Sequence, residues 1–459
     1  MALGKSICRL ADLLQGHLMS ATLVIGAGIA GMQAALDIAD AGFKAYLVEK
    51  EPSIGGRMAQ LDETFPTLDC SSCILTPKMV SVGGHPNIEL LTYSEVVDVS
   101  GSAGHFKVKV KKKPRFIDVE KCTGCGICAE NCRLKDRIDS EFNVGVGKRG
   151  AAYIPFPQAV PLKYTIDAEH CLMIQRGKCG KSPPCSDACP ADAIDFEQHE
   201  EIVQLEVAAI IVATGFDPFD PLLKPEYAYG VYENVITGLQ FERLSSASGP
   251  TFGEIRLNGK PINDVVFIQC VGSRDRNLGN AYCSRVCCMY TAKQAHLVRE
   301  KLPDARVTVF YMDIRAFGKG FEEFYDRVRE ERVLYRRGNP SEIYQRGDRL
   351  VVGSEDTLLG KPVEVEADLV VLAVGLVPRK DAGAVERLLS LSRSDDGFFQ
   401  EAHPKIKPTE TTTAGIYLAG CCQGPKDIPD AVAQAKAAAS SAIVIMSRLI
   451  AKTTTSSEK

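Results

Sequence analysis

Apolar and polar positions follow two different periods along the first part of the chain. Short apolar runs at 22–26 and 44–48 predict strands, and the positions between them have helical spacing to about Ala41. Two more apolar runs, at 208–213 and 415–420, predict strands of the same kind. Strands that alternate with helices indicate an α/β domain built on a parallel sheet.

A second α/β domain is expected between residues 240 and 375. Its strands are predicted at 265–269, 306–311 and 368–374. Strict alternation of apolar and polar residues predicts a small separate sheet with strands at 88–93, 106–110 and 202–206. The chain should end in a helix over 429–449.

The turn after the first strand has the pattern of a dinucleotide-binding site. Gly26, Gly28 and Gly31 follow that strand and open the helix, and Glu49 ends the next strand. The glycines permit a tight turn, a close approach of the backbone to a pyrophosphate, and close packing of helix on strand. The carboxylate of Glu49 can accept a hydrogen bond from a ribose hydroxyl, which favours FAD or NAD over NADP.

Two later segments are typical of flavoproteins that bind two dinucleotides. The run Gly55-Gly56-Arg57 resembles the segment that passes the FAD pyrophosphate in that class. Thr214 and Gly215 end a buried strand in the turn found in flavin reductases. Both segments are therefore expected at a flavin.

A third such segment lies near the C-terminus. Gly420 ends the last strand, where these proteins close around the ribityl chain. Cys421 follows it, where they normally have aspartate. The next helix would point its N-terminus at the flavin, with Asp430 close by. We therefore expect Gly420, Cys421 and Asp430 at the cofactor.

These patterns predict a flavin domain in three pieces with two insertions. The pieces are 20–113, 201–239 and 376–450, and the insertions are a module at 114–200 and the α/β domain at 240–375. Residues 1–19 are expected to be an N-terminal extension, and 451–459 a disordered tail.

Charge and hydropathy exclude several classes of function. The net charge of −4 over 459 residues gives no basic footprint for nucleic acid or an anionic membrane. No apolar run reaches the roughly 20 residues that span a bilayer, and the first 19 residues lack the apolar core of a signal peptide. The protein is therefore expected in the cytoplasm, where 17 cysteines indicate metal or redox chemistry.

Eight cysteines of the first insertion predict a two-cluster ferredoxin, in which the first run has the standard spacing and the second run is looser. Three cysteines two residues apart, with a fourth after three more, form the bacterial run, whose last cysteine ligates the other cluster. One [4Fe–4S] cluster is predicted at Cys122, Cys125, Cys128 and Cys189, and a second at Cys132, Cys171, Cys179 and Cys185. Two structural zinc ions are the alternative, because zinc also takes four ligands.

A third cysteine group replaces a second glycine fingerprint. Cys270 follows the first strand of the second α/β domain, and Cys283, Cys287 and Cys288 are predicted on the first turn of a helix that continues over 289–299. Four thiolates beside two arginines fit an anionic cluster. Four buried apolar cysteines are the alternative. A pyridine nucleotide is disfavoured here because the glycines are missing.

The role of Cys70 and Cys73 is open. Their spacing within the flavin domain fits a catalytic redox dithiol or partial ligation of a cluster, and equally two structural thiols.

Several longer stretches resemble the A subunit of heterodisulfide reductase, which is the flavin subunit of methanogens and of related bacterial complexes. The resemblance covers about residues 20–450. It rests on 55–66, 69–79, 153–161, 267–275, 282–289, 311–319 and 420–429. Archetypal members carry an extra N-terminal domain and a C-terminal ferredoxin, so this chain is expected to be a short form that lacks both.

The resemblance implies a thioredoxin-reductase-like FAD core with an inserted ferredoxin-like module. It also implies a third [4Fe–4S] cluster, in the second α/β domain, and so three in all. The implied activity is that of an oxidoreductase subunit that splits or merges electron pairs at FAD. The implied partners are other subunits of such a complex, a ferredoxin, a hydrogenase or dehydrogenase as donor, and a second copy of the chain.

Two other functions stay open from the residues alone. One is an NAD(P)H-dependent disulfide reductase that uses Cys70 and Cys73. The other is a relay subunit that moves electrons without splitting pairs.

Overall fold

The computed structural model describes residues 21–256 and 261–456, so the predicted N-terminal extension, 1–19, and residues 457–459 lie outside it. The first domain is built on a five-stranded sheet in the order β24-β13-β1-β2-β5, and all its pairs are parallel. Its strands are β1 (Ala21–Ile25), β2 (Lys44–Glu49), β5 (Ile88–Thr92), β13 (Ala209–Val212) and β24 (Ile416–Leu418). Three predicted pieces of chain therefore share one sheet.

Two different layers cover this sheet. Helices α2 (Ile29–Asp40), α3 (Ser71–Gly84) and α11 (Ile428–Ser456) pack on one face, where Val24 is buried. The antiparallel sheet β12-β7-β6, with α10 (Ala382–Leu389), packs on the other, where Leu23 is buried. Successive residues of a strand point to opposite faces, which explains the continuous apolar run of β1.

The small sheet differs from the prediction in one strand. It consists of β6 (Ser94–Ser102), β7 (His105–Lys112) and β12 (Glu201–Val207). The predicted strand at 88–93 is instead β5, which pairs in parallel with β2 at the edge of the main sheet. An edge strand is half exposed, so its alternation does not reveal which sheet it joins.

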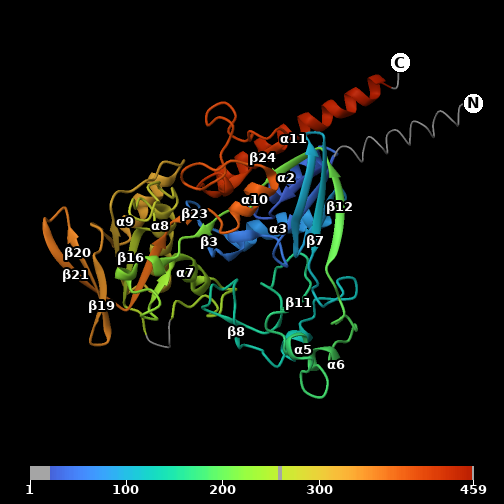
Figure 1. Cartoon of the computed structure of the whole chain (residues 1–459). Helices are drawn as coiled ribbons and strands as arrows, with labels where there is room; N and C mark the ends of the chain where they lie inside the picture. Colours follow the sequence, from blue (N-terminus) through green and yellow to red (C-terminus); the bar gives the residue numbers. More distant parts are fainter. Residues whose placement is uncertain (1–20, 257–260, 457–459) are drawn as a thin grey trace, which may run out of the picture.

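The second domain repeats the layout of the first (Figure 1). Its parallel sheet has the order β15-β22-β16-β17-β18, covered on one face by α7, α8 and α9 and on the other by the antiparallel sheet β19-β20-β21. The parallel strands are β15 (Val235–Thr237), β16 (Asp264–Val271), β17 (Arg306–Tyr311), β18 (Val333–Arg337) and β22 (Leu369–Val374). The other elements are α7 (Gly238–Ser245), α8 (Cys287–Lys301), α9 (Phe321–Glu330), β19 (Glu342–Arg346), β20 (Arg349–Asp356) and β21 (Lys361–Ala367).

Two of the predicted domain boundaries differ from those in the structure. The second sheet begins with β15 at Val235, ahead of the predicted boundary at 240. Helix α11 continues to Ser456, through most of the tail predicted to be disordered. The two domains are joined by the short paired strands β14 (Asp217–Pro218) and β23 (Leu376–Val377).

The inserted segment, residues 114–200, has short elements and its own small core (Figure 1). Its elements are α4 (Ile127–Glu130), β8 (Ile138–Asp139), β9 (Lys148–Arg149), β10 (Ala152–Tyr153), β11 (Thr165–Ile166), α5 (Leu172–Arg176) and α6 (Pro184–Asp187). Buried Arg115 fastens it to the first domain by donating to the Pro52 carbonyl at 2.7 Å.

All three parts of the chain meet at one buried arginine. Arg243 of α7 is fully buried and donates to the Gln60 carbonyl of the first domain and to the Asn143 side chain of the inserted segment, each at 3.1 Å. Its guanidinium also lies 4.9 Å from the centre of the Phe142 ring. These contacts fix the inserted segment and the second domain against the same stretch of the first. No helix in the ranges described combines the length and apolarity needed to cross a membrane.

Candidate functional site

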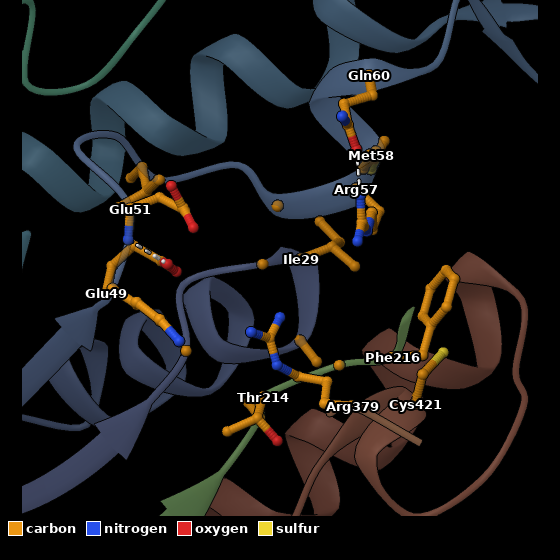
Figure 2. Close-up of a pocket in the computed structure, with 18 of the residues that line it drawn as sticks. Ile29, Glu49, Glu51, Arg57, Met58, Gln60, Thr214, Phe216, Arg379 and Cys421 are labelled. Atoms are coloured by element: carbon orange, nitrogen blue, oxygen red, sulfur yellow. Dashed lines mark hydrogen bonds between the residues drawn. The ribbon is translucent and has the colours of Figure 1, made fainter. Parts of the chain in front are cut away.

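A cavity of about 900 Å³ lies where the three parts of the chain meet. Figure 2 shows Glu49 and Glu51 at one end and Phe216 and Cys421 at the other. The first domain forms most of the wall, the inserted segment adds Phe142 and other side chains, and the second domain adds residues of α7 and α8. The size is that of a large cofactor site.

The glycines predicted to cradle a pyrophosphate lie at one wall of this cavity. Gly26 and Gly28 line it, and Gly31 lies behind them, where a Cβ atom would be only 1.8 Å from the Gly26 carbonyl oxygen. A Cβ at Gly28 would meet no atom within 4 Å. The N-terminus of α2 has no side-chain cap, so its amide groups are open to an anion.

A second glycine turn abuts the first. Gly56 has φ +57° and lines the cavity, and a Cβ there would lie 2.9 Å from Cα of Gly28. Gly55 has φ +123° and lies behind it, against Ala59. Only glycine allows two backbone turns to come this close, which leaves the cavity wall there free of side chains.

Glu49 occupies the place expected of the ribose-binding acid. Its carboxylate accepts from the backbone N–H of Ala27 at 2.7 Å and of Glu51 at 3.0 Å. These bonds fix the carboxylate at the cavity wall beside the glycine turn. Burial raises the pKa of Glu49, and the two backbone donors act against that rise.

A group of charged residues at the cavity was only partly foreseen. Predicted Arg57 lines the cavity and pairs with Asp217 at 3.3 Å. Arg379 and Asp381 also line it, and they pair at 2.9 Å. Burial acts to raise the pKa of Asp381, but Arg379 and Lys50 outweigh it and lower that pKa to about 2. Two arginines here suit the negative charge of a pyrophosphate.

Three of the remaining predicted cofactor-binding residues line the other end of the cavity. Thr214, Gly215 and Cys421 line it, and Cys421 donates to the Lys426 carbonyl at 3.4 Å. Gly420 lies behind the wall, with φ +74° and no room for a Cβ beside Ala30. Asp430 is not at the wall: its carboxylate pairs with Arg285 at 2.9 Å. Its predicted role at a cofactor is therefore not supported by its position.

The cysteines of the inserted segment converge in two adjacent groups. Burial, reinforced by Cys122, Cys185 and Cys125, raises the pKa of Cys128 to about 12. Burial raises the pKa of Cys185 to about 12 as well, reinforced by Cys132, Cys171 and Cys179. Cys132, Cys171, Cys179 and Cys185 also line one small cavity.

The fourth predicted ligand of the first group is less clearly placed. Cys189 packs against the core of the inserted segment, where its sulfur accepts from the backbone N–H of Ala193 at 3.4 Å.

The third cysteine group also comes together. Burial raises the pKa of Cys270 to about 12, with Cys288 and Cys283 adding to the rise, and burial raises that of Cys287 well above its usual value. Cys283 is not on the helix as predicted, because α8 begins at Cys287. The reason is the left-handed backbone of Arg285, with φ +64°, which a helix cannot contain.

The three cysteine groups share one electrostatic property. Buried thiolates that crowd together cannot all ionise unless a cationic centre compensates their charge. Their donor chemistry therefore fits an iron–sulfur cluster. In the part of the chain that the structure describes, no three His, Cys, Asp or Glu side chains stand close enough to hold a single metal ion.

Cys70 and Cys73 lie apart from the cavity. They form a disulfide across the first turn of α3, with Cα atoms 5.3 Å apart, and both residues are exposed. Neither lines the cavity.

Two cysteine groups lie next to residues that line the cavity. Arg149 lines it, and a Cβ at the following Gly150 would lie 3.5 Å from the Cys132 sulfur. In the second domain, Val286 and Tyr290 line the cavity and flank Cys287, whose thiol the Tyr290 hydroxyl contacts. None of these three wall residues was predicted, because only the folded chain brings them to the glycine turn.

Comparisons with known proteins agree with this geometry. A sequence model of the family described as FAD binding domain matches residues 21–60. The A subunit of H(2):CoB-CoM heterodisulfide,ferredoxin reductase from Methanothermobacter marburgensis is 56% identical over 428 residues, which cover 92% of this chain. The second iron-sulfur A subunit of CoB–CoM heterodisulfide reductase from Methanopyrus kandleri is 55% identical over 425 residues, again 92% of this chain.

The chain spans 63% of the length of each of these two relatives. Among solved structures, thioredoxin reductase of Lactococcus lactis matches with a TM-score of 0.51 at 16% identity, over 94% of this chain and 99% of that one. That likeness shows a thioredoxin-reductase-like α/β fold with two parallel sheets. With more than half of the aligned residues identical over 92% of its length, the chain belongs to the family of heterodisulfide reductase A subunits.

Proposed function

We propose that this chain is the FAD- and iron–sulfur-containing electron-transfer subunit of a heterodisulfide-reductase-like complex, in which electron pairs are split or merged at FAD. One observation carries the proposal. A single cavity of the size of FAD is lined both by Arg149, whose neighbour Gly150 contacts Cys132, and by Val286 and Tyr290 beside Cys287.

The residues of the cavity would hold FAD in one orientation. The amides at the N-terminus of α2, with Arg57 and Arg379, would receive the pyrophosphate, and Glu49 would accept from a ribose hydroxyl. Thr214, Gly215 and Cys421 would bound the flavin end. Bound FAD supplies a two-electron centre and each cluster a one-electron centre, so the protein supplies position and electrostatics.

Three cysteine groups would hold three [4Fe–4S] clusters. We assign Cys122, Cys125, Cys128 and Cys189 to one, Cys132, Cys171, Cys179 and Cys185 to another, and Cys270, Cys283, Cys287 and Cys288 to the third. The inserted segment would then act as a ferredoxin-like module. Because its groups and the third group belong to different parts of the chain and each adjoins a residue that lines the cavity, one electron of a pair would leave through each part.

The partners follow from the family and are part of the proposal. The names of the relatives specify one subunit of an enzyme that acts on a heterodisulfide and ferredoxin. We propose other subunits of that kind as partners, with a hydrogenase or dehydrogenase as donor and a second copy of this chain in the complex.

The two-route proposal is tested by removing one cysteine group at a time. The complex would be isolated anaerobically as wild type, Cys185→Ser and Cys287→Ser, and titrated with a reductant while EPR follows each cluster. We expect each variant to lose one cluster signal and keep the flavin. We also expect Cys287→Ser to abolish the ferredoxin reduction that is coupled to the second acceptor, because the favourable route that drives it is interrupted. Reduction of ferredoxin in Cys287→Ser that still requires the second acceptor would refute two separate routes.

The position of Cys70 and Cys73 disfavours a flavin-linked disulfide reductase. A dithiol that exchanges electrons directly with a flavin has to reach it, and this pair is exposed away from the cavity. Turnover of a disulfide with NAD(P)H by wild type, lost in Cys70→Ser, would restore that alternative.

A further inference from the structure

The loop between β16 and α8 contains two arginines that contact different parts of the molecule. Arg274 and Arg285 have φ +58° and +64°, a region that residues other than glycine rarely adopt. Such a conformation persists where the surrounding contacts enforce it, and it often marks a functional position. What each side chain contacts therefore matters.

Arg274 faces the cysteines of its own loop. Its guanidinium pairs with Asp313 and hydrogen bonds to Cys270. It is placed to affect the charge at the third cysteine group.

Arg285 faces the opposite way, toward the first domain. It donates to the Pro425 carbonyl at 3.3 Å and to the Asp430 carboxylate at 2.9 Å. Its guanidinium lies 5.0 Å from the centre of the Phe317 ring. In the described ranges, these two hydrogen bonds are the ones that link the loop at 272–286 to the segment at 421–430.

That segment is the wall of the cavity at the flavin end. Cys421, Lys426 and Asp427 line the cavity. The Cys421 thiol donates to the Lys426 carbonyl at 3.4 Å, and the Lys426 ammonium to the Gly424 carbonyl at 3.2 Å, so the segment is tied to itself. Arg285 thus connects this internally hydrogen-bonded segment of the cavity wall to the cysteine loop. Cys283 lies two residues before Arg285, and Cys287 lies two residues after it.

We propose that Arg285 is a positioning residue that fixes the third cysteine group against the flavin end of the cavity. The inference rests on the proposed function, because it assumes a cluster at Cys270, Cys283, Cys287 and Cys288 and a flavin in the cavity. Electron transfer between two centres slows steeply with their separation. The hydrogen bonds of Arg285 to the Pro425 carbonyl and to the Asp430 carboxylate hold that separation constant.

A set of variants separates this role from general stability. Arg285→Ala removes all three contacts. Asp430→Asn removes the ion pair and leaves the cysteine loop unaltered. Arg329→Ala is the matched control, because Arg329 also pairs with an aspartate, Asp326, and lies over a tyrosine ring, but on the exposed face of α9.

The first readout is the rate at which electrons reach the third cluster after rapid reduction of the flavin, followed by freeze-quench EPR in the anaerobic complex. We expect this rate to fall several-fold in Arg285→Ala, because the two centres are then no longer held at one short separation. Asp430→Asn should fall less, and Arg329→Ala should match wild type. Iron and flavin content should stay at the wild-type level in all three.

The second readout needs neither flavin nor cluster. Amide hydrogen exchange of the chain freed of both should increase in 283–286 and in 421–430 together for Arg285→Ala, and in neither segment for Arg329→Ala. An increase in only one segment would overturn the inference, because loss of the contacts between the two segments should expose the amides of both.

The outcomes also distinguish this inference from the proposed function. A wild-type transfer rate in Arg285→Ala with full iron content overturns the inference and leaves the proposed function intact. If Arg285→Ala loses iron, its transfer rate cannot be interpreted, and the rate in Asp430→Asn is used instead. A wild-type transfer rate in Asp430→Asn then overturns the inference. Wild-type complex without a cluster at Cys287 refutes the third cluster and the inference with it.

Discussion

The loops after β1 and β16 occupy the same place in two similar domains and have opposite chemistry. Each strand is third in a five-stranded parallel sheet and leads into a helix on the same kind of face. After β1, the chain turns through Gly26 and Gly28 straight into α2. After β16, which contains Cys270, it runs through residues 272–286, with Cys283 near their end, before α8 begins at Cys287.

This difference decides what each helix N-terminus can receive. The open amides and absent side chains at α2 suit an anionic pyrophosphate. At α8, thiols fill the corresponding space, and the Cys287 thiol lies beside the Val374 carbonyl at 3.9 Å. One fold thus provides a nucleotide site and a cysteine site by changing a single loop, since sites are determined by local residues and not by the fold.

The largest effect is expected from Gly31→Ala at the nucleotide loop. A Cβ there would lie 1.8 Å from the Gly26 carbonyl oxygen, which belongs to the backbone of the tight turn and cannot move away without disrupting it. We expect a loss of about 3 kcal/mol or more in unfolding free energy from this overpacking, with loss of bound flavin. Flavin absorbance of the purified chain and its thermal unfolding would measure both.

Gly28→Ala is the matched control, because a Cβ there meets no protein atom within 4 Å. The chain should fold as wild type but bind FAD more weakly, since the added methyl enters the cavity. Equal stability loss in both variants would show that the glycine turn serves packing alone.

The second largest effect is expected from Cys287→Ser at the cysteine loop. A [4Fe–4S] cluster needs its own set of thiolates, so this variant should lose about four irons per chain. Cys422→Ser is the control, because Cys422 is equally buried but donates to the Val212 carbonyl at 3.1 Å, away from the three groups. Iron analysis of both variants measures the difference, and a similar iron content in the two would contradict the assignment.

Met289→Ala compares the two helices at their third position. Gly31 holds that position in α2, where no side chain fits, and Met289 holds it in α8, where it is fully buried. Truncation should cost about 2–5 kcal/mol of unfolding free energy, the range for buried Met→Ala. Denaturant unfolding would measure it, and the flavin content should stay at the wild-type level. A loss of flavin would mean that the two helices are not independent.

The smallest effect is expected from Asp381→Asn at the charged edge of the nucleotide site. Because the folded pKa of Asp381 is about 2, below its value in an unfolded chain, its stabilising charge is present above about pH 4 and is lost as the pH falls toward 2. The group is half-exposed, so screening reduces its contribution to about 1 kcal/mol.

The difference in unfolding free energy between Asp381→Asn and wild type should therefore be constant from pH 8 to pH 5. Chemical denaturation at several pH values in that window measures it. A difference that disappears by pH 5 would contradict the ion pair with Arg379.

The parts of this site that are local in the chain were predictable, and the parts made by distant segments were not. The turn at Gly26 and Gly28 is a contiguous pattern whose backbone requirements follow from residue type. The cysteine spacings were informative for the same reason. Arg379, Tyr290 and Arg149 reach the cavity from three separate regions, and each looks like an ordinary surface or core residue in the sequence.

Two differences between the sequence-based expectations and the structure have simple physical causes. Cys283 was placed on a helix because i, i+4, i+5 spacing suits one, but the positive φ of Arg285 interrupts it, and a sequence does not show where a non-glycine residue is forced left-handed. Asp430 was placed at the cofactor because acids favour helix N-termini. In the structure its carboxylate pairs with Arg285 instead.

The central claim is that one flavin lies between separate cysteine groups that hold three clusters. The most direct test is the iron, sulfide and FAD content of this chain, purified anaerobically and separated from its partner subunits, together with its EPR spectrum. The account predicts about twelve irons and twelve sulfides per chain, four of each in every cluster, with one FAD. About eight irons with one FAD would contradict the third cluster, and zinc in place of iron and sulfide would contradict the account as a whole.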